Sequence, residues 1–596
     1  MEHMGCLVNY TGLGRTPVEI QARLPAQLDA RCDAAGRARR RRPSDSDSPF
    51  RPRLNYAVLG SILAAMFFAA AGAAQATTFR AASPSFADVS TAIAAAADGD
   101  TVVVPAGTAD WTSTLTITKG ITLIGATTIS GDHTATMTAT DQTIVKDDAP
   151  RPNGQIIIVS STAGNNFRLS GFTFTKGTTT TQGYSGSIVL KGTSHTVRVD
   201  HCHFLNLVGN HTIQTYDWVY GVLDHCIFDS NSAATAYIQH DAYGGGVAGD
   251  KAWVDGPQFG TANFLFFEDN FFNNTTAVGT IGALDGLGGG RWVVRYNKFH
   301  NCFAGGHGTE TVARGVRAQE QYNNNFNWSV SFPGGSLRSG TMLSHDNTWD
   351  GVTGAVPRSL NAWRTFISLS PWGGASGANP WDLNDTEGNG TNVSGHVPFL
   401  YASGTHTGAS TATILTDSTK SWRINQWAGY TVLNTTINQV GLISSNTSNT
   451  ITYDLYASSG GPLKFNNGDT YQIHRLLAAL DSPGRGAGDL LTRVGGNNSN
   501  PVNSTTGTIA WPHQAMEPCY SWNDKYTPTN TLLGIQGGTG SILKNGVDYF
   551  NSATQPSALS GYTPYTYPHP LVSGASPTPT PAQTPSAPTN LRIMGP

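Results

Sequence analysis

The sequence predicts a parallel β-helix, a solenoid in which each turn of the chain adds one short strand to each of several parallel sheets. The first observation is a repeat: four segments, FFEDNFF, VVRYNKF, EQYNNNF and LSHDNTW, each place Asn two residues before an aromatic ring. The steps between these Asn residues are 27, 27 and 23 residues, a period typical of repeat architectures. The second is that the segments alternate apolar and polar residues between Gly, Asn, Thr and Ser, which favours strands over helices.

The same phase continues upstream in RLSGFTF, RVDHCHF and VLDHCIF, so seven coils are visible. Equivalent residues of neighbouring coils lie about 4.8 Å apart, so identical side chains stack. We therefore expect a ladder of side-chain amides at one turn, formed by Asn270, Asn297, Asn324 and Asn347. An internal column of rings should accompany it, formed by Phe174, Phe204, Phe228, Phe272, Phe299, Phe326 and Trp349. Cys202 and Cys226 replace Asn in the two earlier coils; we expect free stacked thiols, with a disulfide as the alternative.

The remaining elements follow in chain order. Ser85 precedes a helical face of Phe86, Val89, Ile93 and Ala97, which predicts a capping helix over the open N-terminal end. TVVVPAG, TLTITKG and ITLIGA predict the strands of the first coil. The β-helix is expected to span residues 77–404. Residues 405–476 leave the coil period, and runs such as TATILTD and TITYDL predict a small antiparallel β module there. Residues 477–572 are expected to return to the β-helix and close it, before a Pro/Thr-rich linker and tail at 573–596.

The N-terminal region predicts export. Residues 1–53 are expected to form a disordered basic leader, and residues 54–76 a signal peptide whose apolar segment ends before Ala74-Gln75-Ala76. A membrane anchor is the alternative, but the apolar core is shorter than a bilayer span. The interpretation is therefore a secreted or cell-surface protein without stable membrane insertion.

The charge balance excludes one class of partner. The first 53 residues hold ten of the 36 basic and six of the 39 acidic residues. Without them 26 basic and 33 acidic residues remain, and the net charge falls from −3 to −7. An acidic chain is a poor general binder of nucleic acid, so we expect no nucleic-acid partner. The sequence leaves the oligomeric state open.

These motifs resemble the right-handed parallel β-helix proteins of the pectin-lyase-like superfamily, which include pectate and alginate lyases, polygalacturonases and phage tailspikes. The resemblance covers about residues 77–381. It implies a right-handed solenoid, but the same scaffold carries several chemistries, so the activity must be argued from a site.

A first candidate site comes from the period of two along the strands. The residues four positions before each column ring alternate with inward apolar residues, so they should form one outward column: Asp200, Asp224, Glu268, Arg295, Tyr322 and His345. Stacked carboxylates raise one another's pKa or bind a cation, so Asp200, Asp224 and Glu268 are candidate ligands of Ca²⁺. The alternative is a solvated polar ladder that includes an ion pair between Glu268 and Arg295.

A second candidate site is the charge-rich connection GGHGTETVARGVRAQE, residues 305–320, in a chain of which only 13% is charged. β-Elimination of a uronic acid needs a cation beside the substrate carboxylate and a base for the neighbouring proton. The hypothesis assigns catalysis to His307, Arg314, Arg317 and Tyr322. Gly306-His307-Gly308 also occurs in polygalacturonases, but their Asn-Thr-Asp and Asp-Asp motifs are not recognisable. The alternative is structural, with the arginines paired to Glu310 and Glu320.

A third feature is the long step of 44 residues between Phe228 and Phe272, whose excess is either a protruding loop or an irregular extra coil. Loops on solenoids commonly build the binding surface. The expected substrate-binding residues are Tyr243, Lys251, Trp253, Arg295 and Glu310.

The leading hypothesis is a secreted lyase that cleaves a uronic-acid-containing polysaccharide by β-elimination. The alternatives are a non-catalytic glycan-binding or adhesive β-helix, and a glycoside hydrolase with paired carboxylates.

Overall fold

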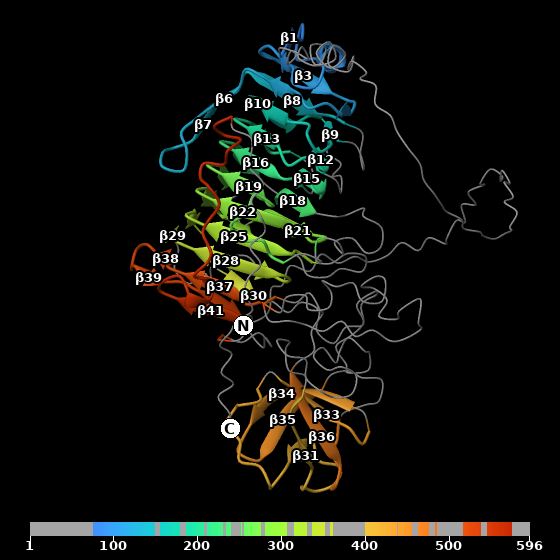
Figure 1. Ribbon diagram of the computed structural model, residues 1–596, viewed down its shortest axis with the longest axis vertical. Coiled ribbons are helices and arrows are strands. Elements are labelled where there is room, and N and C mark those ends of the chain that lie inside the picture. The colour runs from blue at the N-terminus through green and yellow to red at the C-terminus, as the bar shows by residue number, and fades with distance from the viewer. Residues whose placement is uncertain are drawn as a thin grey trace, which may run out of the picture. The chain divides into compact units, whose positions relative to one another are not determined.

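The computed structural model describes residues 76–149, 155–178, 186–207, 211–230, 234–239, 252, 256–275, 281–306, 315–329, 336–351, 358–360, 400–428, 430–437, 439–455, 463–475, 483–484, 517–537, 545–546 and 548–574. The chain divides into two units at residues 74 and 75, and every described residue belongs to the second. These residues form a parallel β-helix, which confirms the predicted fold class, and a six-stranded antiparallel sheet (Figure 1).

Three stacked sheets build the β-helix. Sheet A has twelve parallel strands: β1 Thr78–Arg80, β2 Thr101–Val103, β5 Thr122–Ile124, β10 Phe167–Ser170, β13 Val197–Asp200, β16 Gly221–Asp224, β19 Leu265–Glu268, β22 Arg291–Arg295, β25 Ala318–Tyr322, β28 Thr341–His345, β37 Cys519–Trp522 and β41 Tyr549–Ser552. Sheet B has eleven: β3 Gly107–Trp111, β8 Thr143–Asp147, β11 Thr173–Lys176, β14 His203–Leu205, β17 Ile227–Ser230, β20 Phe271–Asn274, β23 Lys298–His300, β26 Asn325–Trp328, β29 Thr348–Gly351, β38 Lys525–Tyr526 and β39 Thr531–Leu532. All its pairs are parallel except that of β38 with β39.

Sheet C has seven parallel strands: β4 Leu115–Ile117, β9 Ile157–Ser161, β12 Ile188–Gly192, β15 His211–Asp217, β18 Ala234–Gln239, β21 Ile281–Leu287 and β24 Cys302–Ala304. A further parallel sheet contains β27 Ser336–Leu337, β30 Arg358–Leu360 and β40 Ile535–Gly537, and a bridge between Gly306 and Leu337 brings it beside the end of sheet C. A typical coil therefore runs from sheet A to sheet B to sheet C and then back to sheet A.

The turn from sheet A to sheet B explains why the repeats are visible in the sequence. One residue in each turn has a left-handed backbone, with φ between 49° and 56°: His201, His225, Asp269, Tyr296, Asn323, Asp346 and Asn523. The next residue points into the coil and forms the ladder. The Asn297 side chain accepts a 3.0 Å bond from the Asn270 backbone N–H, and the Asn324 side chain accepts one from Asn297. The amide ladder is therefore confirmed.

The ladder continues into a residue that the repeat did not reveal. Asp524 accepts 2.9 Å bonds from the backbone N–H and the side-chain amide of Asn347. Cys202 and Cys226 occupy the ladder position in the earlier coils as buried free thiols, as predicted.

The ring column is also confirmed. From Phe174 to Trp349, successive rings stack with centroids 4.5 to 5.6 Å apart. The column lies inside one continuous core with the predicted inward residues Val199, Leu223 and Phe267.

The N-terminal end of the β-helix and a patch on the outer face of sheet B are covered. Helix α2, Phe86–Ala95, is capped by the Ser85 side chain and buries Val89, Ala92 and Ile93, which confirms the capping helix. Its end at Ala95 leaves Ala97 outside the helix. A hairpin of β6 Thr128–Ser130 and β7 Thr138–Thr140 extends beside the coils (Figure 1). It packs Ile129 and Met137 against Ile227 on the outer face of sheet B.

The antiparallel sheet contains β31 Leu400–Thr405, β32 Ile414–Thr416, β33 Tyr430–Asn434, β34 Gln439–Asn446, β35 Thr450–Leu455 and β36 Thr470–Arg475. It has a core of its own, which includes Trp427 and Phe465. Its first strand begins at Leu400, before the predicted boundary at residue 405, because β31 completes the sheet by pairing with β36. No helix in the described ranges is long and apolar enough to span a bilayer.

Candidate functional site

The structure confirms that the residues of the predicted outward column are register partners on successive strands. Asp200, Asp224, Glu268, Arg295, Tyr322 and His345 pair in succession along sheet A. Yet none of these side chains lies on an open surface, since all six residues are buried. The prediction of an exposed column is therefore corrected, and the reason differs between its two ends.

At the N-terminal end of the column, arginines neutralise the aspartates. Arg198 Nε lies 2.8 Å from both Asp200 Oδ2 and Asp224 Oδ1, and Arg198 Nη2 lies 2.8 Å from Asp224 Oδ2. Arg168 Nη2 adds a 2.7 Å contact to Asp200. Burial alone raises the pKa of Asp200, but His201 and the two arginines outweigh it and hold the pKa below its ordinary value.

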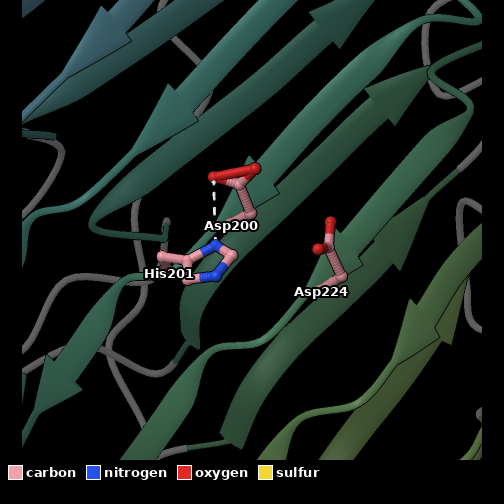
Figure 2. Close-up of side chains that lie close together, drawn as sticks. All are labelled: Asp200, His201 and Asp224. Atoms are coloured by element: carbon pink, nitrogen blue, oxygen red, sulfur yellow. Dashed lines mark ion pairs between the residues drawn. The ribbon is translucent and has the colours of Figure 1, made fainter. Parts of the chain in front are cut away.

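These carboxylates do not fit the expected calcium site. Asp200, His201 and Asp224 place one ligand atom each within 4.8 Å of one another (Figure 2), but Glu268 is not in that group. Ca²⁺ takes six to eight oxygen ligands. The carboxylate oxygens here already face guanidinium groups, and a His nitrogen is a poor calcium ligand. The arrangement is that of a buried ion-pair network.

A segment from Ser557 to Gly574, the strap, runs along sheet A and covers the column (Figure 1). Arg295 donates to the carbonyl oxygens of Tyr565 and Thr566 at 2.5 and 2.8 Å. Glu268 binds Arg295 at 2.7 Å and accepts a 2.7 Å bond from the backbone N–H of His569. Arg295 and Glu268 therefore hold the strap, and the predicted role of Arg295 in substrate binding is corrected.

The strap also contacts sheet A towards both ends of the column. The Tyr562 hydroxyl donates a 2.6 Å bond to Glu320 and lies 3.3 Å from His345 Nε2. Arg198 donates to the carbonyl oxygens of Leu571 and Val572 at 3.0 and 3.2 Å. Burial beside Arg295 and Arg198 lowers the pKa of His569 to about 3, so its imidazole is neutral.

Two predicted catalytic residues lie in this buried layer. Tyr322 is 1% exposed and accepts a 3.0 Å bond from Arg295. Burial raises the pKa of Tyr322, so it cannot act as a base at neutral pH. Arg317 is fully buried and forms a two-pronged ion pair with Glu517 at 2.5 and 2.9 Å. Both assignments are corrected, and Arg317 has a structural role, as the alternative held, with Glu517 as a partner.

The remaining predicted residues lie outside the described residues: His307, Glu310, Arg314, Tyr243, Lys251 and Trp253.

Sheet C carries the groove that sequence analysis missed. A cavity of about 570 Å³ opens on its outer face, lined by Gln155, Ile158, Ser160, Val189, Lys191, Gly192, Tyr216 and Asp217. Ser160, Lys191 and Tyr216 are register partners on three consecutive strands, β9, β12 and β15. They point outward because Val159, Leu190 and Ile213 of the same strands lie in the core.

The groove combines the groups that sugar acids require. Lys191 and Tyr216 are register partners on adjacent coils, whose strands lie about 4.8 Å apart, and they supply an ammonium group and a phenol. Asp217 follows in a left-handed turn with φ 62°. Gln155 and Ser160 add polar groups, while Ile158 and Val189 supply an apolar floor. The signal that could have revealed the site is the shared phase of IVLKG and HTIQTYD.

Comparisons with known proteins add little. No family model matches the chain, and a search of curated proteins finds no match. Among solved structures, the crystal structure of alginate lyase from Paenibacillus sp. str. FPU-7 is similar at 13% identity. The match covers 48% of this chain and 93% of that one, with a TM-score of 0.20. At that score the likeness carries no argument about function, which rests on the groove.

Proposed function

We propose that this chain binds an acidic polysaccharide in the groove of sheet C and cleaves it by β-elimination. The observation that carries the proposal is the juxtaposition of Lys191 and Tyr216 as register partners in that groove. A neighbouring cation and a proton-transfer group are the two elements that elimination beside a carboxylate requires.

The chemistry assigns one role to each residue. The ammonium group of Lys191 pairs with the uronate carboxylate and stabilises the negative charge that develops on it. The Tyr216 oxygen takes the proton from C5. The electron pair forms the C4–C5 double bond as the C4–O4 bond breaks. The leaving O4 then receives the proton, which the Tyr216 hydroxyl can return.

A hydrolase is less well supported by the described residues. Hydrolysis by paired carboxylates needs two carboxyl groups that flank the bond. The described lining of the groove contains one, Asp217. The other carboxylate pair considered from sequence, Asp200 and Asp224, is buried against Arg198.

The test is turnover on alginate, polygalacturonate and a neutral glucan, with ultraviolet absorbance of the unsaturated product and reducing ends measured together. We expect both signals on a uronic polymer, and a loss of at least about 100-fold in kcat for Lys191→Ala and for Tyr216→Phe. Lys176→Ala and Tyr526→Phe on sheet B are the matched controls. Reducing ends without ultraviolet absorbance would indicate a hydrolase, and binding without either signal would indicate a non-catalytic glycan binder.

We also propose that the protein is exported and that its signal peptide is removed. Cleavage after Ala76 would make Thr77 the first residue, and Thr77 N lies 2.7 Å from Asp100 Oδ1. A free α-ammonium group there would form a charge-assisted bond with a carboxylate. Backbone N–H groups of Ala97 and Thr77 already hold the pKa of Asp100 below its usual range. N-terminal sequencing of exported protein should give Thr77.

A further inference from the structure

A second groove lies on another part of the β-helix, at the corner where sheet A turns into sheet B. Its volume is about 300 Å³, and its lining is His133, Tyr296, Asn297, Asn323, Asn324, Asn325, Asp346 and Thr348. Tyr296, Asn323 and Asp346 are the left-handed residues of three consecutive turns. With coils about 4.8 Å apart, the corner offers a run of roughly 10 Å.

Two segments remote in sequence build one wall of this groove. His133, from the tip of the β6–β7 hairpin, places Nδ1 2.5 Å from Asp269 Oδ1. The hydroxyl of Tyr567, from the strap, donates to both oxygens of Asp269 at 3.0 and 3.1 Å. Tyr296 stacks on Tyr567 with centroids 3.8 Å apart, and its ring lies 5.0 Å from that of His133. The wall is therefore fixed before any ligand arrives.

Some of the polar side chains that line the groove can form further hydrogen bonds. The buried amides of Asn297 and Asn324 are used in the ladder. In the part of the chain that the structure describes, the Asn323 side chain and the Tyr296 hydroxyl have no hydrogen-bond partner. Asn325 uses its NH₂ on Thr348 and Asp350, at 3.1 and 2.6 Å, which leaves its side-chain oxygen to accept.

The charge of the groove decides which saccharide it fits. Its lining contains one carboxylate, Asp346, and no Lys or Arg. Burial alone raises the pKa of Asp346, but bonds from His345 and Asn523 bring it below its usual range, so the group is ionised at neutral pH. His133 faces Asp269, and the Lys298 ammonium group donates to the carbonyl oxygen of Ala135. The Lys525 ammonium group, which is outside the lining, also lowers the pKa of Asp346. Its charge balances that carboxylate, so the lining has no excess positive charge to attract an anionic sugar.

We propose that this corner groove binds an uncharged oligosaccharide. Sugar hydroxyls hydrogen-bond to the Asn323 amide, the Asn325 side-chain oxygen and Asp346, while ring C–H groups pack against His133 and Tyr296. This site is independent of the groove on sheet C, since it lies at the corner between sheets A and B and needs no elimination chemistry. The corner groove lets the protein bind neutral glycan whether or not sheet C cleaves a uronic polymer.

The experiment is isothermal titration of the full protein with cellotetraose, xylotetraose, mannotetraose and tetragalacturonate. We expect at least one neutral tetrasaccharide to bind. Its affinity should fall about tenfold or more in Asn323→Ala and in Tyr296→Ala. Asn530→Ala is the matched control, because Asn530 is an exposed asparagine with φ 53° outside the groove. Lys191→Ala should also leave this affinity unchanged, which separates the site from the proposed function.

Three outcomes would overturn the inference. One is that no neutral tetrasaccharide binds. Another is that binding persists in Asn323→Ala when thermal unfolding shows that this variant is folded. The third is that tetragalacturonate binds more tightly than every neutral probe and loses that affinity in Asn323→Ala. Should Tyr296→Ala unfold because it loses its stack on Tyr567, Asn323→Ala still decides the matter.

Discussion

The hydroxyl of Tyr562 donates a 2.6 Å hydrogen bond to Glu320, a carboxyl group that solvent does not reach. The second oxygen of Glu320 accepts from the backbone N–H of Gly260 at 2.7 Å. A residue of the strap and a residue in the loop before β19 thus meet on one side chain of sheet A. The strap is held by such buried polar contacts, and its stability should depend on pH.

The first prediction concerns Glu320. Burial raises the pKa of Glu320 above its ordinary value, despite its bonds from Tyr562 and Gly260. A carboxyl group with a raised folded-state pKa contributes stability at low pH and loses it as pH rises above the unfolded value of about 4.3. Glu320→Gln, which keeps an acceptor oxygen, should therefore flatten the fall in unfolding free energy between about pH 4.3 and pH 7. Glu268, also raised by burial, preserves part of the slope. Equal slopes in wild type and variant would contradict this account.

The second prediction concerns the amide ladder. The Asn297 NH₂ donates to Phe267 O, Arg295 O and Asn324 Oδ1 at 2.9 to 3.0 Å. Asn297→Leu removes these bonds and the acceptor for Asn270, so unfolding free energy should fall by about 1–3 kcal/mol or more. Chemical denaturation measures it, with Asn530→Leu as the exposed control. No loss relative to that control would mean that the ladder contributes nothing to stability.

The third prediction concerns the ion pairs around Arg198. Removing one partner of a buried ion pair leaves the other charges uncompensated. Arg198→Ala should therefore lower the free energy of unfolding by about 3–5 kcal/mol. Because the arginines already neutralise Asp200 and Asp224, wild-type melting temperature should be the same in calcium and in a chelator. A rise of several degrees in calcium that disappears in Asp200→Asn would show that a metal binds there after all.

The fourth prediction concerns the antiparallel module. Its first and last strands pair, with Leu400 opposite His474, so its two chain ends lie side by side. No strand of this sheet pairs with a β-helix strand within the described ranges. Replacing residues 400–475 by a short Gly/Ser bridge should leave the β-helix with one cooperative thermal transition. Loss of cooperative unfolding in that variant would show that the module helps to close the coils.

Much of the fold could be predicted because the stacking of coils requires similar residues at equivalent positions, and these appear in the sequence as a repeat. Each coil must supply a small amide or thiol at the ladder and a ring at the column, as Asn297 and Phe299 do, so the repeat identifies both the fold and the register. The strap produces no such repeat in the sequence. Its contacts to Arg295 use the carbonyl oxygens of Tyr565 and Thr566, which every residue possesses, and so the covering of the column was not foreseeable.

The groove of sheet C was missed for a related reason. Its outward column is Ser160, Lys191 and Tyr216, three different residues, because a binding surface does not require identical side chains to stack. The connections into sheet C also vary in length, so its strands lose phase with the repeat. The sequence therefore indicates where the coils are more readily than where a ligand binds.

The ladder step from Asn347 to Asp524 crosses 177 residues, whereas the step from Asn270 to Asn297 crosses 27. By loop-closure entropy, joining these last two coils costs about 1.7 kcal/mol more than an ordinary step. Prior folding of the antiparallel module reduces that difference, because it brings Leu400 and His474 together and shortens the free loop. We therefore expect the coils up to β28 and the module to form independently, β37 to dock afterwards, and the strap to close last. Pulsed hydrogen exchange during refolding should accordingly protect β28 before β37.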